Sequence, residues 1–150
     1  MKTTFRLFLM LAAVAAFAVH LGCSNSGGAS AVGKTLFEQL GGEEGVAKFA
    51  GQFGAGLQAN PELSQLLSPE AIENAKAGLS NDIKKASNMS AGDMSLDSAL
   101  KDQKLDSNTL AGVNNAIVQA AKGMNLNQET TDSLTKLIKP LAHSVLEPKL

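Results

Sequence analysis

Apolar residues recur three and four positions apart along residues 35–146, and no stretch alternates strictly between apolar and polar positions. The first pattern is typical of amphipathic helices and the second would indicate strands. The four clearest stripes are Val46, Phe49, Ala50, Phe53 and Leu57; Ile72, Ala75, Leu79 and Ile83; Leu110, Val113, Ile117, Ala120, Ala121 and Met124; and Leu134, Leu137, Ile138, Leu141, Val145 and Leu146. The pattern predicts an all-α domain packed around one core.

Residues that start and stop helices divide this pattern into elements. The predicted N-caps are Asn60, Ser68, Asp106 or Ser107, and Asn127. Pro61 and Pro69 follow two of these caps, at the first helical position, where a missing N–H costs nothing. Short helices are expected at 35–40 and 96–100, separated from the longer ones by glycines or by polar residues. Pro140 lies within the last pattern and should kink or split that helix, because it removes a backbone hydrogen bond.

The first 22 residues do not belong to this domain. Lys2 and Arg6 give a basic start, and an apolar run without charge follows at 7–19. That run is shorter than the roughly 20 residues that a membrane-spanning helix needs. A basic start, a short apolar stretch and small residues before a cleavage point are typical of a secretory signal peptide. We therefore expect residues 1–22 to be removed on export.

The only cysteine follows directly after this segment. His20-Leu21-Gly22-Cys23 resembles the lipobox of bacterial lipoproteins, although the family usually has leucine where His20 stands. The resemblance implies that Cys23 is acylated and anchors the protein to a membrane, and Ser24 implies sorting to the outer membrane. The alternative is a secreted protein with one free thiol, since a lone cysteine cannot form an internal disulfide. Residues 23–34 are small and polar, which favours a lipidated, flexible tether.

The charge of the mature chain excludes one class of partner. Without Lys2 and Arg6, the mature chain has 11 basic and 14 acidic residues, for a net charge of −3. No basic stripe is visible, so we expect no nucleic-acid binding. The expected partners are the membrane, through acyl chains on Cys23, and a small apolar ligand or an envelope protein.

Residues 35–67 carry more than helix signals. Phe37, Leu40-Gly41-Gly42, Phe53 and Asn60-Pro61 stand in the order and spacing of the N-terminal half of group 1 truncated haemoglobins. The chain resembles that family from here to its C-terminal helices. The resemblance implies that residues 35–150 form a two-on-two helical sandwich, the fold that holds haem in the family.

The same resemblance locates the residues of the family's haem chemistry. The position of the proximal histidine falls on Leu100, and that of the distal tyrosine falls on Gly54. Haem iron needs an axial donor, normally an imidazole. The mature chain has one histidine, His143, which we interpret as a surface residue, and a site made by Met94 would be unusual. We therefore expect no cofactor-binding residue and no bound haem, with haem kept as the alternative.

Glycines 51, 54 and 56 share one predicted helix and should each destabilise it by about 1 kcal/mol relative to alanine. They favour either very close helix packing or a frayed helix. In a haemless globin fold they would let neighbouring helices close over the space that haem leaves.

No catalytic or metal-binding constellation emerges from the remaining residues. Nucleophilic catalysis needs a base close to the nucleophile, and His143 beside Pro140 makes a poor triad. The methionines at 89, 94 and 124 are interpreted as gap-fillers in the core. The clustered carboxylates, which we interpret as solvated surface, are Glu43, Glu44, Asp93, Asp97, Asp102 and Asp106.

The sequence thus predicts a cell-envelope lipoprotein whose globin-like domain is a binding or structural module and not an enzyme. Two alternatives stay open. One is a truncated haemoglobin that binds haem and oxygen or nitric oxide through an unconventional ligand. The other is a helical envelope lipoprotein unrelated to globins.

Overall fold

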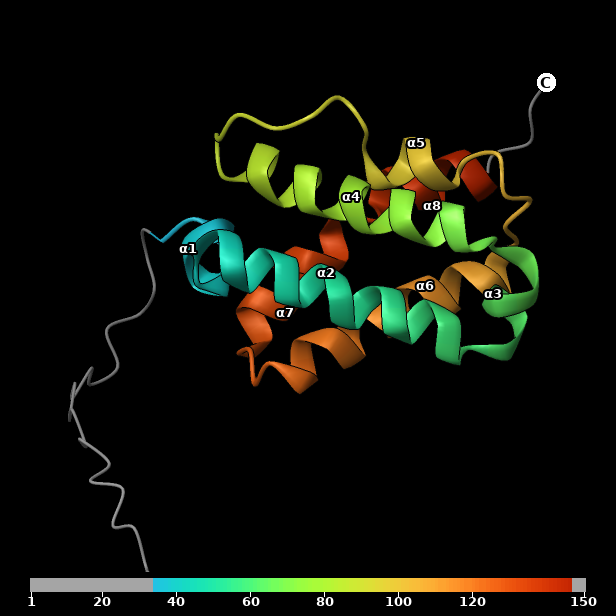
Figure 1. Cartoon of the computed structure of the whole chain (residues 1–150), viewed down its shortest axis with the longest axis horizontal. Coiled ribbons are helices and arrows are strands. Elements are labelled where there is room, and N and C mark those ends of the chain that lie inside the picture. Colours follow the sequence, from blue (N-terminus) through green and yellow to red (C-terminus); the bar gives the residue numbers. More distant parts are fainter. Residues whose placement is uncertain (1–33, 147–150) are drawn as a thin grey trace, which may run out of the picture. The chain divides into compact units, whose positions relative to one another are not determined.

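The domain is all-α. The structure, a computed structural model, describes residues 34–146 except for the side chains of 145 and 146. Within that range the chain forms eight helices and no strand (Figure 1). They are α1 (Leu36–Leu40), α2 (Gly42–Ala59), α3 (Pro61–Leu66), α4 (Pro69–Ala86), α5 (Leu96–Leu100), α6 (Ser107–Gly123), α7 (Gln128–Lys136) and α8 (Lys139–Leu146). The predicted signal peptide (1–22), the predicted acylation site Cys23 and the predicted tether up to residue 33 lie outside the described residues.

The predicted N-caps are confirmed. Asn60 Oδ1 accepts from the amides of Glu62 and Leu63 at 3.0 and 3.2 Å, at the start of α3. The other capping oxygens accept from the third residue of their helices, as follows: Ser68 from Ala71 at 3.1 Å, Asp106 from Thr109 at 2.8 Å, and Asn127 from Thr130 at 2.8 Å. Each bond satisfies an amide that has no partner within its own helix. These local signals set where the long helices begin.

Pro140 splits the last helical pattern, as predicted. α7 ends at Lys136, two turn residues follow, and α8 begins at Lys139. Pro140 is therefore the second residue of α8, a position whose amide has no intrahelical partner to lose. We call residues 137–138, between the two helices, the α7–α8 break.

α2 lies at the centre of the domain and packs most extensively against α6 and α4. Phe49, Phe53 and Leu57 on its buried face have no exposed surface. Gly56 faces Ala116 of α6 so closely that a Cβ at Gly56 would lie 3.0 Å from the Ala116 Cβ. The small residues thus let the two helix backbones approach each other.

The remaining helices complete the core around this centre. α5 packs on α4, α8 contacts α5 and α6, and α7 contacts α6 and α1. Two hydrogen bonds join α1 to elements distant in sequence. The Phe37 amide donates to Ser87 Oγ at 2.9 Å, and Thr130 Oγ1 donates to Gln39 Oε1 at 2.6 Å. Ser87 and Thr130 are buried polar residues, and these bonds satisfy them.

One interpretation of the sequence is wrong. Met89 and Met94 are 39% and 40% exposed, on the connection between α4 and α5, and do not fill gaps in the core. Asn81 Nδ2 donates to the Met94 carbonyl and Asn81 Oδ1 accepts from the Gly92 amide, and these bonds hold the connection away from the core. Met124 is partly buried and packs against the core, as expected.

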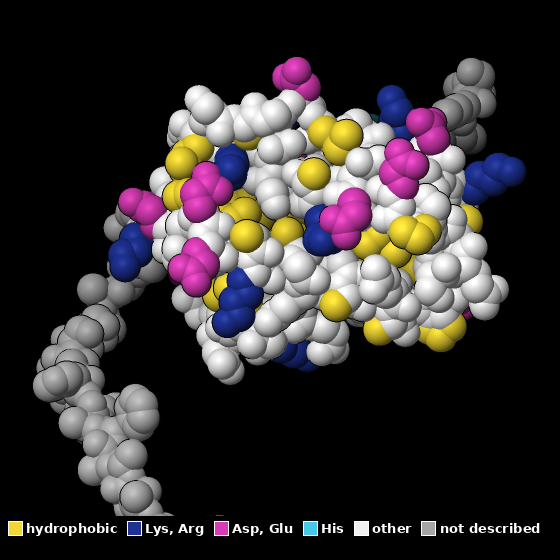
Figure 2. All heavy atoms as spheres, viewed as in Figure 1, with side chains coloured by type: hydrophobic (Ala, Val, Ile, Leu, Met, Phe, Trp, Pro, Cys, Tyr) yellow, Lys and Arg dark blue, Asp and Glu magenta, His cyan; other side chains and the backbone are white. Residues whose placement is uncertain are grey.

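The surface visible in Figure 2 mixes acidic and basic side chains and shows no large patch of one sign. Among residues 34–146, no helix combines the length and apolarity needed to cross a membrane.

Candidate functional site

Leu100, which the resemblance assigns to the position of the proximal histidine, is a core residue. It ends α5 and has no exposed surface. It belongs to the same buried cluster as Phe49 and Phe53 of α2. An aliphatic side chain has no lone pair to offer a metal, so Leu100 contributes packing alone.

Gly54, which the resemblance assigns to the position of the distal tyrosine, is covered by a neighbouring side chain. A Cβ at Gly54 would lie 2.6 Å from Cδ of Lys76 on α4. The Lys76 ammonium group meanwhile pairs with Glu73 at 2.8 Å at the surface. The aliphatic part of the lysine thus lies over the glycine, and a tyrosine at position 54 would require it to move.

These residues do not fit haem in the manner of the family. Neither position carries a donor atom, and neither residue lines the hollows described below. His143 is exposed on α8, and Met94 lies on the exposed α4–α5 connection. α2 is continuous over Gly51, Gly54 and Gly56. Gly54 and Gly56 are closely packed, whereas a Cβ at Gly51 would meet nothing within 4 Å.

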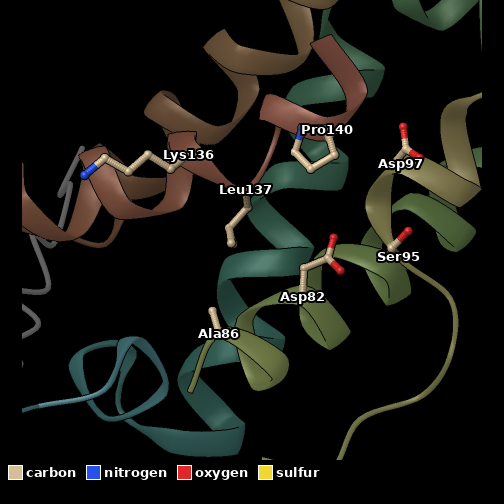
Figure 3. A pocket seen from close by; sticks show the side chains of 7 residues that line it. All are labelled: Asp82, Ala86, Ser95, Asp97, Lys136, Leu137 and Pro140. Carbon is tan, nitrogen blue, oxygen red and sulfur yellow. The ribbon is translucent and has the colours of Figure 1, made fainter. Parts of the chain in front are cut away.

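A pocket of about 350 Å³ opens beside the α7–α8 break (Figure 3). We call it the Asp82 pocket. Its walls come from α4, from the start of α5 and from the break, and its lining residues are Asp82, Ala86, Ser95, Asp97, Lys136, Leu137 and Pro140. In Figure 3 the Asp82 carboxylate extends toward Pro140, Ser95 and Asp97 lie beside it at the start of α5, and Lys136 extends away from them.

The two carboxylates of this pocket hold helices together. Asp82 accepts from the amide of Leu96, the first residue of α5, at 2.8 Å, so α4 supplies a cap to α5. Asp97 of α5 accepts from Ser144 Oγ of α8 at 2.8 Å. Neither carboxylate belongs to an ion pair within residues 34–146. The Asp82 and Asp97 carboxylates therefore each stabilise contacts between helices, whether or not a ligand binds in the pocket.

Burial raises the pKa of the Asp82 carboxyl, because a half-buried charge loses hydration. The Leu96 amide and the charge of Lys85 oppose this rise, and the charge of Asp97 adds to it. The pocket combines two carboxylates and a hydroxyl with apolar walls, but within residues 34–146 the Ser95 hydroxyl is hydrogen-bonded to Ser98 and to neither carboxylate. This arrangement is suited to binding or to holding structure and lacks the partners of a nucleophilic site.

Asp82 was missed by sequence reasoning. It stands between the buried positions Leu79 and Ile83 on α4, where a charged residue interrupts the apolar face. That interruption was the only available signal, since its partner Leu96 is 14 residues further along the chain. Of the clustered carboxylates, Asp97 lines the pocket and Glu43 pairs with Lys84 at 2.9 Å. The others are exposed: Glu44, Asp93, Asp102 and Asp106.

Replacing Asp82 with asparagine should change how stability depends on pH. The raised pKa means that the folded chain keeps the Asp82 proton to a higher pH than the unfolded chain does. The wild type therefore loses stability as pH rises from the ordinary value of 3.8 through the raised value. Asp82→Asn keeps an acceptor for Leu96 and lacks this titration. Its stability relative to wild type should thus rise with pH over that window, measured by urea unfolding.

The matched variant Asp82→Ala removes the acceptor altogether. It leaves the buried Leu96 amide without its partner and should cost about 1–3 kcal/mol. Because this variant also lacks the Asp82 titration, its cost relative to wild type should decrease as pH rises through the same window. Identical pH profiles for wild type and Asp82→Asn would contradict the role given to burial.

A second hollow, of about 440 Å³, lies on the α6 side of the α7–α8 break. We call it the α6–α8 groove. Leu110 and Ala111 of α6 and Ile138 and Ala142 of the break and α8 form its apolar lining. Its polar lining residues are Ser107, Asn114, Thr135 and Lys139. The break therefore presents successive side chains to two different hollows.

Within residues 34–146 no group of three or more His, Cys, Asp or Glu side chains could hold a metal ion. Comparisons with protein-family models, with curated proteins and with solved structures find no match to this chain. The resemblance to truncated haemoglobins therefore rests on the residues quoted for it.

Proposed function

We propose that this protein is a lipid-anchored binding module of the cell envelope, with a globin-like domain that works without haem and without catalysis. The observation that carries the proposal is the complete burial of Leu100 in the apolar core. A side chain in that environment stabilises the domain by excluding water and offers nothing to a metal.

The helix pairing supports the globin-like part of the proposal. α2 pairs with α4, and α6 pairs with the broken helix α7–α8. α2 and α4 run antiparallel, since Glu43 meets Lys84 near one end and Gly54 meets Lys76 further along. Two such pairs are what a two-on-two sandwich requires. If the domain were unrelated to globins, it would resemble the family in the spacing of its helices but not in how those helices pair.

The binding part of the proposal is supported by the two hollows at the α7–α8 break. Concave sites with apolar walls and a few polar groups are the usual form of small-ligand sites. Both hollows are in the size range of such sites, at about 350 and 440 Å³. Among the described residues that line them, neither hollow has a nucleophile hydrogen-bonded to a general base, which favours a binding role over catalysis.

The lipid anchor can be tested by replacing Cys23 with alanine. Wild type expressed in a bacterial host should incorporate labelled palmitate and sediment with the membranes. Cys23→Ala should incorporate no palmitate and should no longer sediment with the membranes. Two or three acyl chains anchor a protein stably, and the variant would carry no acyl chain to insert into the bilayer. Fractionation followed by immunodetection measures both outcomes.

Ser26→Ala is the matched control, since it changes a small residue of the tether and leaves the cysteine in place. It should behave as wild type. Unlabelled wild-type protein recovered without membranes would contradict the anchor, and it would leave the statements about Leu100 unaffected.

A further inference from the structure

We propose that the α6–α8 groove binds the anion of a medium- or long-chain fatty acid, with its acyl chain on the apolar lining and its carboxylate at Lys139. This inference rests on the proposed binding function and names the ligand class and the site. The groove is the larger of the two hollows at the break.

The lining of the groove is suited to a single acyl chain. Leu110 and Ile138 are each 8% exposed, so they are buried in the core and still present an edge to the groove. Ala111 is exposed and Ala142 is partly buried, and their small side chains leave the space open. From Ser107 to Asn114 the α6 wall extends for about 10 Å, at 1.5 Å per residue. Transfer of an apolar chain onto such a surface is favourable because it removes apolar area from water.

Charge complementarity selects an anion. Among the residues that the structure describes, Lys139 is the one ionisable residue that lines the groove. It takes part in no ion pair or side-chain hydrogen bond within residues 34–146, in contrast to Lys76 and Lys84, which pair with glutamates. A cationic amphiphile would be repelled there.

The Asp82 pocket is a weaker candidate for the same ligand. Its two carboxylates would repel an anion, and both already accept hydrogen bonds that fix α5. The two hollows therefore differ in the sign of the charge that lines them as well as in shape. Binding of an anionic amphiphile should distinguish them.

The test uses the chain from Ser24 onward, which contains every residue of the buried core. Its binding of dodecanoate, dodecanol and dodecyltrimethylammonium is followed by amide chemical shifts below the micellar concentration. Dodecanoate should bind with the highest affinity and should shift the amides of Leu110, Ala111, Ile138 and Ala142.

Two variants separate the acyl site from the carboxylate site. Ala111→Trp fills the groove from an exposed position and should raise the dissociation constant for dodecanoate at least about tenfold. Lys139→Gln should raise it about threefold, which is typical of a solvent-exposed ion pair, and should abolish the preference for dodecanoate over dodecyltrimethylammonium. The matched controls are Ala55→Trp and Lys48→Gln, at exposed positions of α2. Both should bind as wild type does.

Three results would overturn the proposal. They are shifts centred on the Asp82 pocket, equal affinity of wild type for the anion and the cation, and no binding by correctly folded wild type. Because the chain used carries no lipid and no haem is added, each of these failures is separate from a failure of the anchor or of the statements about haem.

Discussion

Replacing Leu100 with alanine is expected to lower the free energy of unfolding by about 3 kcal/mol, within the range measured for leucine-to-alanine changes in well-packed cores. Leu100 has no exposed surface and lies at the end of α5, where it joins the common core. The loss combines the apolar area returned to water with the cavity that remains. Urea unfolding followed by circular dichroism measures it.

The matched control is Leu66→Ala, at the end of α3, where the leucine is only partly buried. Its cost should be less than half that of Leu100→Ala, since less apolar area is returned to water. Similar values for the two variants would show that position 100 is not the packed core site described here. The same conclusion would follow if Leu100→Ala were as stable as wild type.

Replacing Gly78 with alanine should lower the free energy of unfolding by about 2 kcal/mol. A Cβ at Gly78 would lie 2.6 Å from the carbonyl carbon and oxygen of Ser95 and 2.7 Å from the amide nitrogen of Leu96. These are backbone atoms at the start of α5 and cannot move without displacing that helix. The shift would also disturb the hydrogen bond from Leu96 to Asp82. Thermal and urea unfolding should agree on the direction.

Gly51→Ala is the matched control on α2, because a Cβ there would meet nothing within 4 Å. The same chemical change should then stabilise the protein by about 0.5–1 kcal/mol through the higher helix propensity of alanine. Opposite signs for the two glycines are the expected result. If Gly78→Ala were also stabilising, the close contact between α4 and the start of α5 would be wrong.

The order and the ends of the helices could be predicted because their signals are local. Asn60 and Ser68, each followed by proline, cap the helices that follow within three residues. Pro140 interrupts the last helix through the geometry of its own ring. The buried stripes on α2, α4 and α6 could also be predicted from the 3.6-residue period. That period identifies the apolar face of a helix even when the helix that packs against it is unknown.

The candidate sites could not be predicted in the same way because they depend on contacts between distant residues. Asp82 caps α5 from a different helix, and Asp97 of α5 is bound by Ser144 of α8. Met89 and Met94 have apolar side chains, but the Asn81 hydrogen bonds keep their segment at the surface. A sequence pattern shows whether such residues are polar or apolar. It does not show which distant residues they contact, and those contacts determine whether they are buried or exposed.

The α7–α8 break links these two kinds of result. A single proline, readable from the sequence, ends one helix and starts another. The break then directs Leu137 to the Asp82 pocket and Ile138 to the α6–α8 groove, which the sequence did not indicate. A local backbone effect thereby produces two hollows with different chemistry.

We propose that the apolar core occupies the place where the family holds iron, and titration with haem tests this proposal most directly. Wild type and Leu100→His are each mixed with haem and followed by absorbance. Wild type should give no Soret band beyond that of free haem, whereas Leu100→His, if it folds, should gain one through its new imidazole. A stoichiometric, saturable Soret band with wild type would contradict the account, whatever the behaviour of the variant.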